Sequence, residues 1–224
     1  GHVLKLTAPI IGELPRLSAR MEHISRLEVV GDGQPLQINT FLQLFPRLRN
    51  LTLRHLALEG LPETIAAMPN LNELILSDCQ LRLNQQAHGR LSALSRLVTL
   101  DLYNNPLGRT PTVEHMPNLK YLDLNHTGIT ELPAGLLTRQ DLTLALLSHN
   151  RIQTLPAELF DAPARISDKL DLSENPLSRA SLERVKAHFQ RTARHWGISA
   201  DRRMGPRPNS CSPLSAATKS IASF

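Results

Sequence analysis

The chain has 224 residues, of which 41% are hydrophobic but only 4% aromatic, so aliphatic side chains have to build the core of a domain of this length. No run of 18 apolar residues is present, which argues against a membrane-spanning helix, and the two cysteines, Cys79 and Cys211, are too few for a disulfide framework. The formal net charge of +5 is uneven, because residues 179–224 hold nine Lys and Arg against two Asp and Glu, leaving 16 against 18 before them. A main part so close to neutral excludes nucleic acid as the expected partner, since such binding depends on clustered basic side chains.

The first residues, Gly-His-Val-Leu-Lys-Leu, already have the pattern of a strand, so we expect the chain to begin inside a larger protein. The same pattern returns as a unit with leucine at positions 1, 4 and 6, Asn, Cys or Thr at position 9, and an aliphatic residue at position 11. Full copies start at Leu71, Leu97 and Leu119, and the series continues with the copy that starts at Leu142 and has Ala145 at position 4. The fourth position of the full and partial copies falls at residues 4, 27, 51, 74, 100, 122, 145 and 170, which are 22 to 26 residues apart. Units of this period cannot bury their apolar face alone and are expected to stack.

This pattern resembles the leucine-rich-repeat family over residues 1–177, and the resemblance implies an α/β fold, the leucine-rich-repeat solenoid. We expect a curved parallel sheet on the concave face, with loops and short helices on the convex face. The position-9 side chain is expected to turn inward, where Asn can bond unpaired backbone groups. A longer unit after Leu81 predicts a convex helix that includes Gln85 and Leu91. Leu-Pro pairs mark the return path of four units, at Leu14, Leu61, Leu132 and Leu155.

Residues 178–198 are predicted to form a helix that caps the solenoid, whose last repeat would otherwise expose its apolar edge. Ser178 is placed as the N-cap and Gly197 where the helix stops. The apolar residues of this segment recur at spacings of three and four, as one helical stripe: Leu182, Val185, Phe189, Ala193 and Trp196. Residues 199–224 are rich in Pro, Ser and Ala with little to bury, and are predicted to be a disordered tail.

A narrower resemblance lies at the junction 170–192, which reads Leu-Asp-Leu-Ser-Glu-Asn-Pro-Leu-Ser-Arg-Ala-Ser-Leu-Glu-Arg-Val-Lys-Ala-His-Phe-Gln-Arg-Thr. It is similar to the segment that joins the repeats to the catalytic domain in bacterial effector ubiquitin ligases of the novel type. In that family the repeats select the substrate, and the catalytic cysteine lies in a Cys-x-Asp motif. Here Cys211 is followed by Ser212 and Pro213. The resemblance therefore implies a substrate-recognition part without the ligase motif.

Residues between the strand leucines, at the third, fifth and seventh positions, are expected to project from the concave face. Both tyrosines, Tyr103 and Tyr121, fall there on neighbouring strands about 4.8 Å apart. Aromatic anchors within a polar surface are typical of interaction hot spots. The alternative is that tyrosine is simply well tolerated in exposed strands. The predicted partner-binding residues are Ile75, Asp101, Tyr103, Tyr121, Asp123, Leu144 and Leu146.

The charges of the same face are predicted to be graded along the solenoid. Asp101, Asp123 and Asp171 share the fifth position, with Glu174 nearby, whereas the opposite end carries basic side chains at Lys5, Arg26 and Arg54. Such a gradient favours a partner of complementary charge. Ordinary solubilising charge is the alternative.

Other chemistry finds little support in the pattern. His55, His126 and His149 share the eighth position, but no further ligands at suitable spacing complete a metal site. Cys79 stands at the inward position 9, where it serves as a small core residue. The aspartates come without a nucleophile or a pocket. We therefore expect no metal, no cofactor and no enzyme activity of this chain.

The resulting hypothesis is a protein-binding module, the substrate-recognition part of a secreted bacterial effector that acts in the host cell cytoplasm, as the resemblance implies. The alternative is a fragment of a ubiquitin ligase whose catalytic domain is missing from this chain. Attachment of the basic tail to nucleic acid or membrane is a third hypothesis, which steep salt dependence would reveal.

Overall fold

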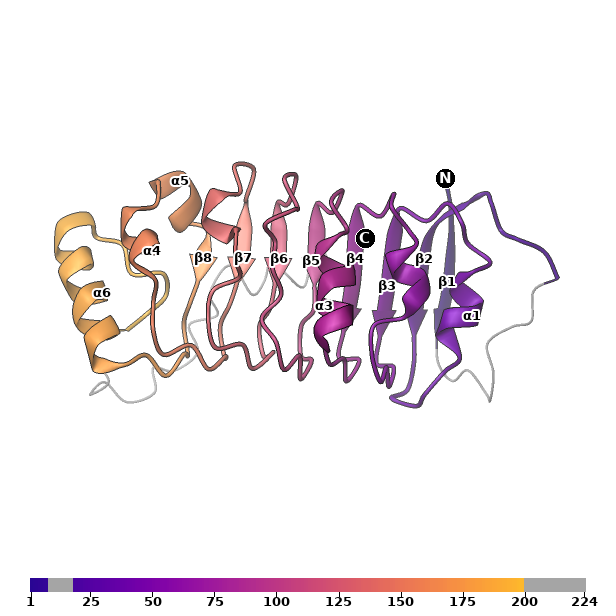
Figure 1. Ribbon diagram of the computed structural model, residues 1–224, viewed down its shortest axis with the longest axis horizontal. Coiled ribbons are helices and arrows are strands. Elements are labelled where there is room, and N and C mark those ends of the chain that lie inside the picture. Colours follow the sequence, from indigo (N-terminus) through magenta and orange to yellow (C-terminus); the bar gives the residue numbers. More distant parts are fainter. Residues whose placement is uncertain (8–17, 200–224) are drawn as a thin grey trace.

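The computed structural model describes residues 1–7 and 18–199, and within them eight parallel strands form one sheet whose spatial order is the order of the chain. Figure 1 shows the strands side by side along the long axis of the molecule, in an open sheet with little curl. The strands are β1 (His2–Thr7), β2 (Ile24–Val30), β3 (Asn50–Arg54), β4 (Glu73–Ser77), β5 (Thr99–Asp101), β6 (Tyr121–Asp123), β7 (Leu144–Leu146) and β8 (Leu170–Asp171). The predicted fold class, a parallel-sheet solenoid with one strand per repeat, is confirmed.

The register of the sheet follows the repeat pattern along its whole length. The fourth position of each repeat lies opposite the fourth position of the next, from Leu4 against Leu27 at one end to Ala145 against Leu170 at the other. A slip by one residue would turn the leucines of a strand to the opposite face. The apolar face of each strand therefore fixes this register.

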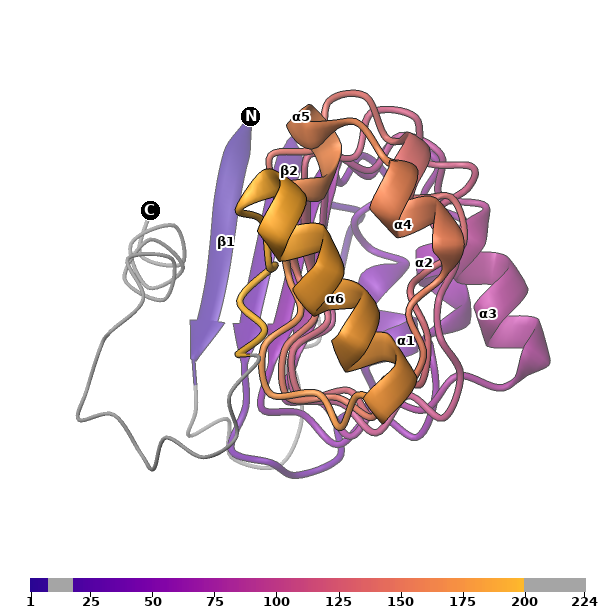
Figure 2. The same ribbon diagram turned by 90° about the vertical axis from the view of Figure 1, so that its left-hand side faces the viewer.

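The return path of each repeat lies on the side opposite the sheet, where Figure 2 shows the helices. The predicted helix after Leu81 is present as α3, and the Asn84 side chain caps it by accepting a hydrogen bond from the Ala87 amide at 2.8 Å. Pro62 and Pro156 precede one-turn helices, so two of the Leu-Pro pairs begin convex helices, whereas Leu14 lies outside the described residues. The helices are α1 (Ile38–Leu42), α2 (Glu63–Ala66), α3 (Gln85–Ser92), the 3-10 helix η1 (Leu136–Thr138), α4 (Ala157–Asp161), α5 (Ala164–Ser167) and α6 (Arg179–Thr192).

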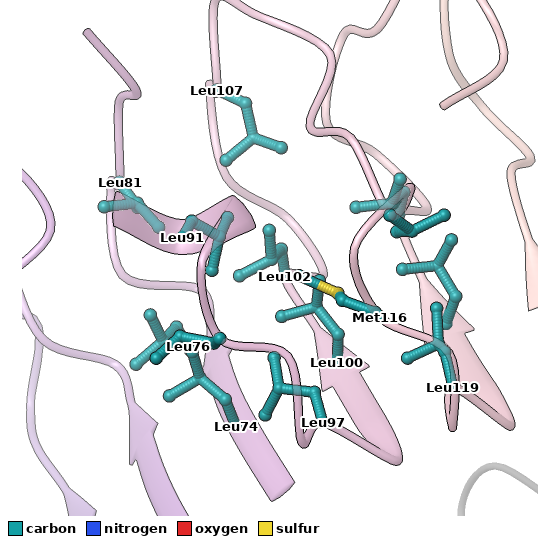
Figure 3. Packing of buried hydrophobic residues seen from close by; sticks show 14 of the residues in the cluster. Leu74, Leu76, Leu81, Leu91, Leu97, Leu100, Leu102, Leu107, Met116 and Leu119 are labelled. Atoms are coloured by element: carbon teal, nitrogen blue, oxygen red, sulfur yellow. The ribbon is translucent and has the colours of Figure 1, made fainter. Parts of the chain in front are cut away.

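Leucines of successive repeats form one continuous core between the sheet and the return path. Figure 3 shows Leu74 and Leu76 of one repeat beside Leu100 and Leu102 of the next, and all four side chains are fully buried. Burial of such a side chain contributes about 1.5–3 kcal/mol. No helix in the described part of the chain combines the length and the apolar character that crossing a bilayer requires.

The position-9 asparagines point inward and bond the backbone of two repeats at once, as predicted. The Asn105 side-chain amide donates to the carbonyl oxygens of Leu76 (2.6 Å) and Leu102 (2.9 Å), while its oxygen accepts from the amides of Cys79 and Leu81, both at 3.0 Å. Asn150, two repeats later, makes the corresponding bonds to the Leu124 and Leu147 carbonyls and from the Thr127 and Gly128 amides. These bonds satisfy backbone groups that leave the sheet where each strand ends and would otherwise be buried without partners.

Helix α6 begins as predicted, because the Ser178 side chain accepts a hydrogen bond from the Ser181 amide at 3.2 Å. It ends earlier than predicted, since Ala193 adopts a left-handed conformation with φ of 58°. The chain then turns back to the sheet, where the Leu172 amide donates to the Trp196 carbonyl at 2.8 Å. Trp196 is thus buried from the segment that follows the helix.

The buried stripe of α6 is also rotated from the predicted one. The helix buries Ser181, Val185 and His188, and the His188 ring stacks on Trp196 with centroids 4.9 Å apart. Phe189 is 45% exposed and Ala193 is exposed, so their assignment to a buried stripe is wrong. The early end of the helix removes the last two apolar positions from the helical period, and the buried face shifts accordingly. The cap role of residues 178–198 stays a prediction, and the predicted tail lies, apart from Ser199, outside the described residues.

Replacing Asn105 or Asn150 by leucine is expected to lower the free energy of unfolding by about 1–3 kcal/mol, because buried backbone groups lose their partners. Urea unfolding measures the change. Asn118→Leu alters an exposed asparagine and should shift the free energy by less than about 0.5 kcal/mol. Wild-type stability in the Asn105 variant would contradict the role of the network.

A second pair of substitutions tests the observed face of α6. Val185→Ala should destabilise the chain by about 1–2 kcal/mol, because the Val185 side chain is only 1% exposed. Phe189→Ala removes a larger but half-exposed side chain and should cost less in thermal or urea unfolding. A larger destabilisation by Phe189→Ala than by Val185→Ala would contradict the observed buried face and support the stripe predicted from the sequence.

Candidate functional site

The face of the sheet turned away from the core, called the sheet face below, carries three rows of side chains at the third, fifth and seventh repeat positions. The third row runs through Thr99, Tyr121 and Leu144 on adjacent strands. The fifth row runs through Ile75, Asp101, Asp123, Leu146 and Asp171. The seventh row contains Tyr103 and Asn125, which come two residues after Asp101 and Asp123. The structure thus brings all seven predicted site residues together across β4 to β7.

The exposure of these residues differs from the expectation that all of them project into solvent. Tyr103 is 40% exposed, and Ile75, Tyr121 and Leu144 are half-buried. The three residues of the central row are buried: Leu146 is 4%, Asp101 9% and Asp123 2% exposed. The expectation that Leu146 presents free apolar surface is therefore wrong.

The reason is the position of the fifth row in the sheet. A residue there has neighbours two positions before and after it on its own strand and one on each adjacent strand, all on the same face. Asp123, for example, lies between Asp101 and Leu146 in register and between Tyr121 and Asn125 along its strand. Neighbours on all four sides leave little of such a side chain open to water.

The two buried aspartates each close a turn at the end of their strand. One carboxylate oxygen of Asp101 accepts from the Tyr103 amide, and one of Asp123 accepts from the Asn125 amide, both at 2.9 Å. Asp171 makes the same bond to the Ser173 amide at 3.0 Å. The Tyr121 hydroxyl donates to the second oxygen of Asp123 at 3.5 Å.

Burial and a neighbouring acidic charge, Glu73 for Asp101 and Asp101 for Asp123, raise the pKa of both carboxyls. Removal from water raises the pKa of Asp101, while the Tyr103 amide and the charge of Arg54 act in the opposite direction. Burial and then the neighbouring Asp101 charge raise the pKa of Asp123 to about 7. Near neutral pH the pair therefore holds a proton that an exposed pair would have released.

A row of rings continues from Tyr103 along the end of the strands. The Tyr103 ring meets the His126 ring edge to face with centroids 5.7 Å apart, and His126 stacks on His149 at 4.4 Å. Both histidines are exposed and have positive φ, 56° and 55°. Burial, and then the neighbouring His149, lower the pKa of His126, so the stack is favoured in its neutral form. Sequence reasoning considered these histidines only as metal ligands; their shared eighth position in adjacent repeats was the signal for stacking.

Cys79 is a core residue, as predicted. It is fully buried, its Sγ donates to the Leu53 and Ser77 carbonyls at 3.3 Å, and burial raises its pKa to about 11. A thiol held protonated in this way is a poor nucleophile. Among the described residues, no group of three or more His, Cys, Asp or Glu side chains is arranged to hold a metal ion.

The raised pKa values predict an unusual pH dependence of stability. Between the ordinary carboxyl pKa near 4 and the raised value of about 7, the folded chain binds more protons than the unfolded chain. The stabilisation of the folded chain by this proton binding is therefore fully present below pH 4 and is lost as pH rises through 7. The variant Asp101→Asn/Asp123→Asn retains an acceptor oxygen for each turn amide and removes both charges. Its free energy of unfolding should exceed that of the parent by on the order of 1–4 kcal/mol at pH 8, and by a smaller amount at pH 5.

Chemical denaturation at the two pH values measures this difference. Asp171→Asn is the matched control, because Asp171 makes the same turn bond but is half-buried and lies opposite Leu146 rather than another carboxylate. It should leave the pH dependence nearly unchanged. A double variant less stable than the parent at pH 8 would show that the charges themselves stabilise the fold.

Comparison with known proteins agrees with the repeat architecture. Residues 89–137 match a family model described as two copies of leucine-rich repeats. Lumican of Gallus gallus is 29% identical over 147 residues, which cover 62% of this chain and 40% of lumican. Toll-like receptor 2 type-1 of Gallus gallus is 32% identical over 151 residues, covering 58% of this chain and 19% of the receptor.

A solved leucine-rich-repeat protein of Leptospira interrogans aligns over 80% of this chain and 59% of its own, with 22% identity and a TM-score of 0.47. The chain matches well under two thirds of the length of lumican and of the Toll-like receptor. The repeat pattern, the in-register parallel sheet and the matched family model together support the leucine-rich-repeat family for this chain, whose fold is the leucine-rich-repeat solenoid.

Proposed function

We propose that this chain is a protein-binding module whose partner docks on the sheet face over β4 to β7. The observation that carries the proposal is Tyr103, a large aromatic side chain that is 40% exposed in the middle of the sheet. It continues into the His126–His149 stack on one side. Half-buried Ile75, Tyr121 and Leu144 extend the apolar surface over neighbouring strands. An exposed aromatic residue surrounded by partly covered apolar ones is typical of a binding hot spot.

The stability of the fold does not require this surface. The core lies on the other side of the sheet and is closed by the leucines of the repeats. The other large hydrophobic side chains that are exposed in the described part of the chain are Val3 and Phe189, which lie at opposite ends of the solenoid. Tyr103 therefore marks the centre of the sheet as the favoured docking position.

Its relatives support a binding role in general terms. Lumican and Toll-like receptor 2 type-1 share the repeats with this chain, and leucine-rich repeats typically act by binding proteins rather than by catalysis. The buried thiol of Cys79 and the buried turn-forming aspartates fit the same reading, because each has a structural explanation.

We further propose that the partner is a host protein and that the chain is the substrate-recognition part of a secreted bacterial effector acting in the host cytoplasm. This finer proposal rests on the resemblance of residues 170–192 to the junction of effector ubiquitin ligases. Its alternative, a fragment of such a ligase, makes a separate prediction: ubiquitin transfer would require sequence beyond this chain, because Cys211-Ser-Pro departs from the Cys-x-Asp motif. Ubiquitin transfer by the 224-residue chain itself would contradict both.

The docking position is tested by the double variant Tyr103→Ala/Tyr121→Ala. Hot-spot aromatic residues typically each contribute about 2 kcal/mol or more, so loss of both should lower the affinity for a protein partner isolated with this chain by roughly several hundredfold. Dissociation constants from calorimetry measure this loss, with melting temperatures recorded beside them. Because Tyr121 is half-buried, a small loss of stability is expected.

Arg109→Ala and Gln153→Ala are the controls, since both residues are exposed and lie outside the strands, on the return path. They should change the affinity by less than about twofold. Normal affinity in the tyrosine variant would place the docking site elsewhere on the solenoid.

A further inference from the structure

A histidine lies at the centre of the contact between α6 and the last repeats. Figure 2 shows α6 across the end of the solenoid. His188 of this helix is only 6% exposed, and its ring stacks on Trp196 with centroids 4.9 Å apart. The Phe160 ring of α4 meets both His188 and Trp196 edge to face, each at 5.6 Å. Rings from α4, from α6 and from the segment after α6 thus form one cluster.

This cluster buries polar ring nitrogens without satisfying them. Among the described residues, neither Nδ1 of His188 nor Nε1 of Trp196 has a hydrogen-bond partner. Buried polar groups nearly always have one, because an unpaired group has lost its bonds to water without replacement. A leucine or phenylalanine at position 188 would be buried without this cost. His188 therefore weakens the contact in which it takes part.

The charges around His188 make its protonated form costlier than the neutral form. Arg191 of the same helix and Arg194 of the segment after it are the basic groups that act on the ring, and Asp161 of α4 is the acidic one. Arg194 is itself paired with Asp168, at the end of α5, at 2.7 Å. Burial, followed by the charges of Arg191 and Arg194, lowers the pKa of His188, while Asp161 acts in the opposite direction. The contact therefore favours the neutral ring.

The other bonds that attach α6 and the segment after it do not change charge in the range where imidazoles titrate. The Leu155 amide donates to the Ser181 hydroxyl oxygen, and the Arg184 guanidinium donates to the Leu155 carbonyl, both at 3.2 Å. The Leu172 amide donates to the Trp196 carbonyl at 2.8 Å. Hydroxyl, backbone and guanidinium groups keep their charge between pH 5 and 7. Within the cluster, the group that titrates in this range is the His188 ring.

We propose that His188 makes the end of the solenoid a pH-sensitive switch, in which residues 179–198 pack on the last repeat while the ring is neutral and detach when it is protonated. Protonation places a positive charge and an N–H without an acceptor inside the contact, and both are hydrated only after the segment moves away. Detachment uncovers apolar side chains of the last repeat, such as Leu172 and Leu177, which are buried in the attached state. The inference does not depend on the proposed docking face.

The direction of the pH dependence follows from the lowered pKa. An imidazole in water titrates near 6.5, and His188 in the attached segment titrates below that value. The detached segment therefore binds the proton more tightly. The attached state is fully favoured above about pH 6.5 and loses stability as pH falls through the lowered pKa.

The test uses the 224-residue chain and its single tryptophan, Trp196, whose fluorescence reports on this cluster. From pH 7 to pH 5 the emission maximum should move to longer wavelength, because the indole, now 5% exposed, enters water. Amide-exchange protection factors in α6 should fall at least about threefold. Protection in β5 and β6 should not fall, since the buried aspartates of these strands gain a proton as pH falls. An NMR titration of the same chain should give His188 a pKa below the ordinary imidazole value.

Variants of the chain assign the effect to His188. His188→Phe keeps a ring against Trp196 and His188→Leu keeps an apolar side chain, and neither takes up a proton. In both, the emission maximum and the α6 protection factors should be the same at pH 7 and pH 5. His195→Gln is the matched control, because His195 is exposed and its ring meets Phe189 at 5.7 Å outside the cluster. It should behave as the parent does.

Three results would overturn the inference. In the first, acidification lowers the intensity of Trp196 emission at constant wavelength and leaves α6 protection unchanged, which means that His188 is protonated in place. In the second, the transition persists in both variants at position 188 or disappears in His195→Gln. In the third, the NMR titration gives His188 a pKa at or above the ordinary imidazole value, an outcome that decides the matter even where a variant does not fold.

Discussion

Every repeat of this chain has an apolar edge that it cannot cover by itself, and the fold depends on each repeat covering the next. Leucines at the inward positions meet their counterparts one repeat away, as Leu74 meets Leu100. Where the strands end, the backbone leaves the sheet inside the molecule, and Asn105 and Asn150 supply the missing hydrogen bonds to two repeats at once. Apolar stacking and these asparagines together hold the strands in one register, and the register aligns the side chains of the sheet face.

The sequence predicted the repeats, the strands and their register, because a leucine period of 22 to 26 residues leaves few alternatives. It also predicted which face of the sheet Tyr103, Asp101 and Leu146 occupy, since successive side chains of a strand point to opposite faces. It did not predict how deeply they are buried, because burial depends on the sizes of neighbours on three strands at once. Leu146 and the aspartates lie in the central row and are buried, whereas Tyr103 lies just beyond the end of β5 and is 40% exposed.

The end of the last helix shows a different limit of sequence reasoning. The stripe through Phe189 and Trp196 has helical spacing, but a left-handed residue at Ala193 ends the helix between them. A glycine or asparagine would have signalled such an end, and alanine does not. His188 then takes the buried place beside Trp196, a role that a polar residue at that position did not suggest.

The sheet face also contains a conflict that the core lacks. In the core the asparagines at the ends of the strands, such as Asn105, have their hydrogen-bond partners within the chain. On the sheet face two buried carboxyls adjoin without a basic partner within ion-pairing distance in the described residues, beside an exposed tyrosine. Burial raises the pKa of both carboxyls, so near neutral pH the pair holds a proton instead of forming an ion pair within the described residues.

The claim that a partner docks on this face is tested most directly by cross-linking. The photoreactive residue p-benzoylphenylalanine, placed at Tyr103 in one variant and at Gln153 in another, reports which side of the solenoid lies within a few ångströms of a captured partner. The account predicts a covalent adduct from position 103 and none from position 153. An adduct from position 153 alone would place the partner on the return path and contradict the account.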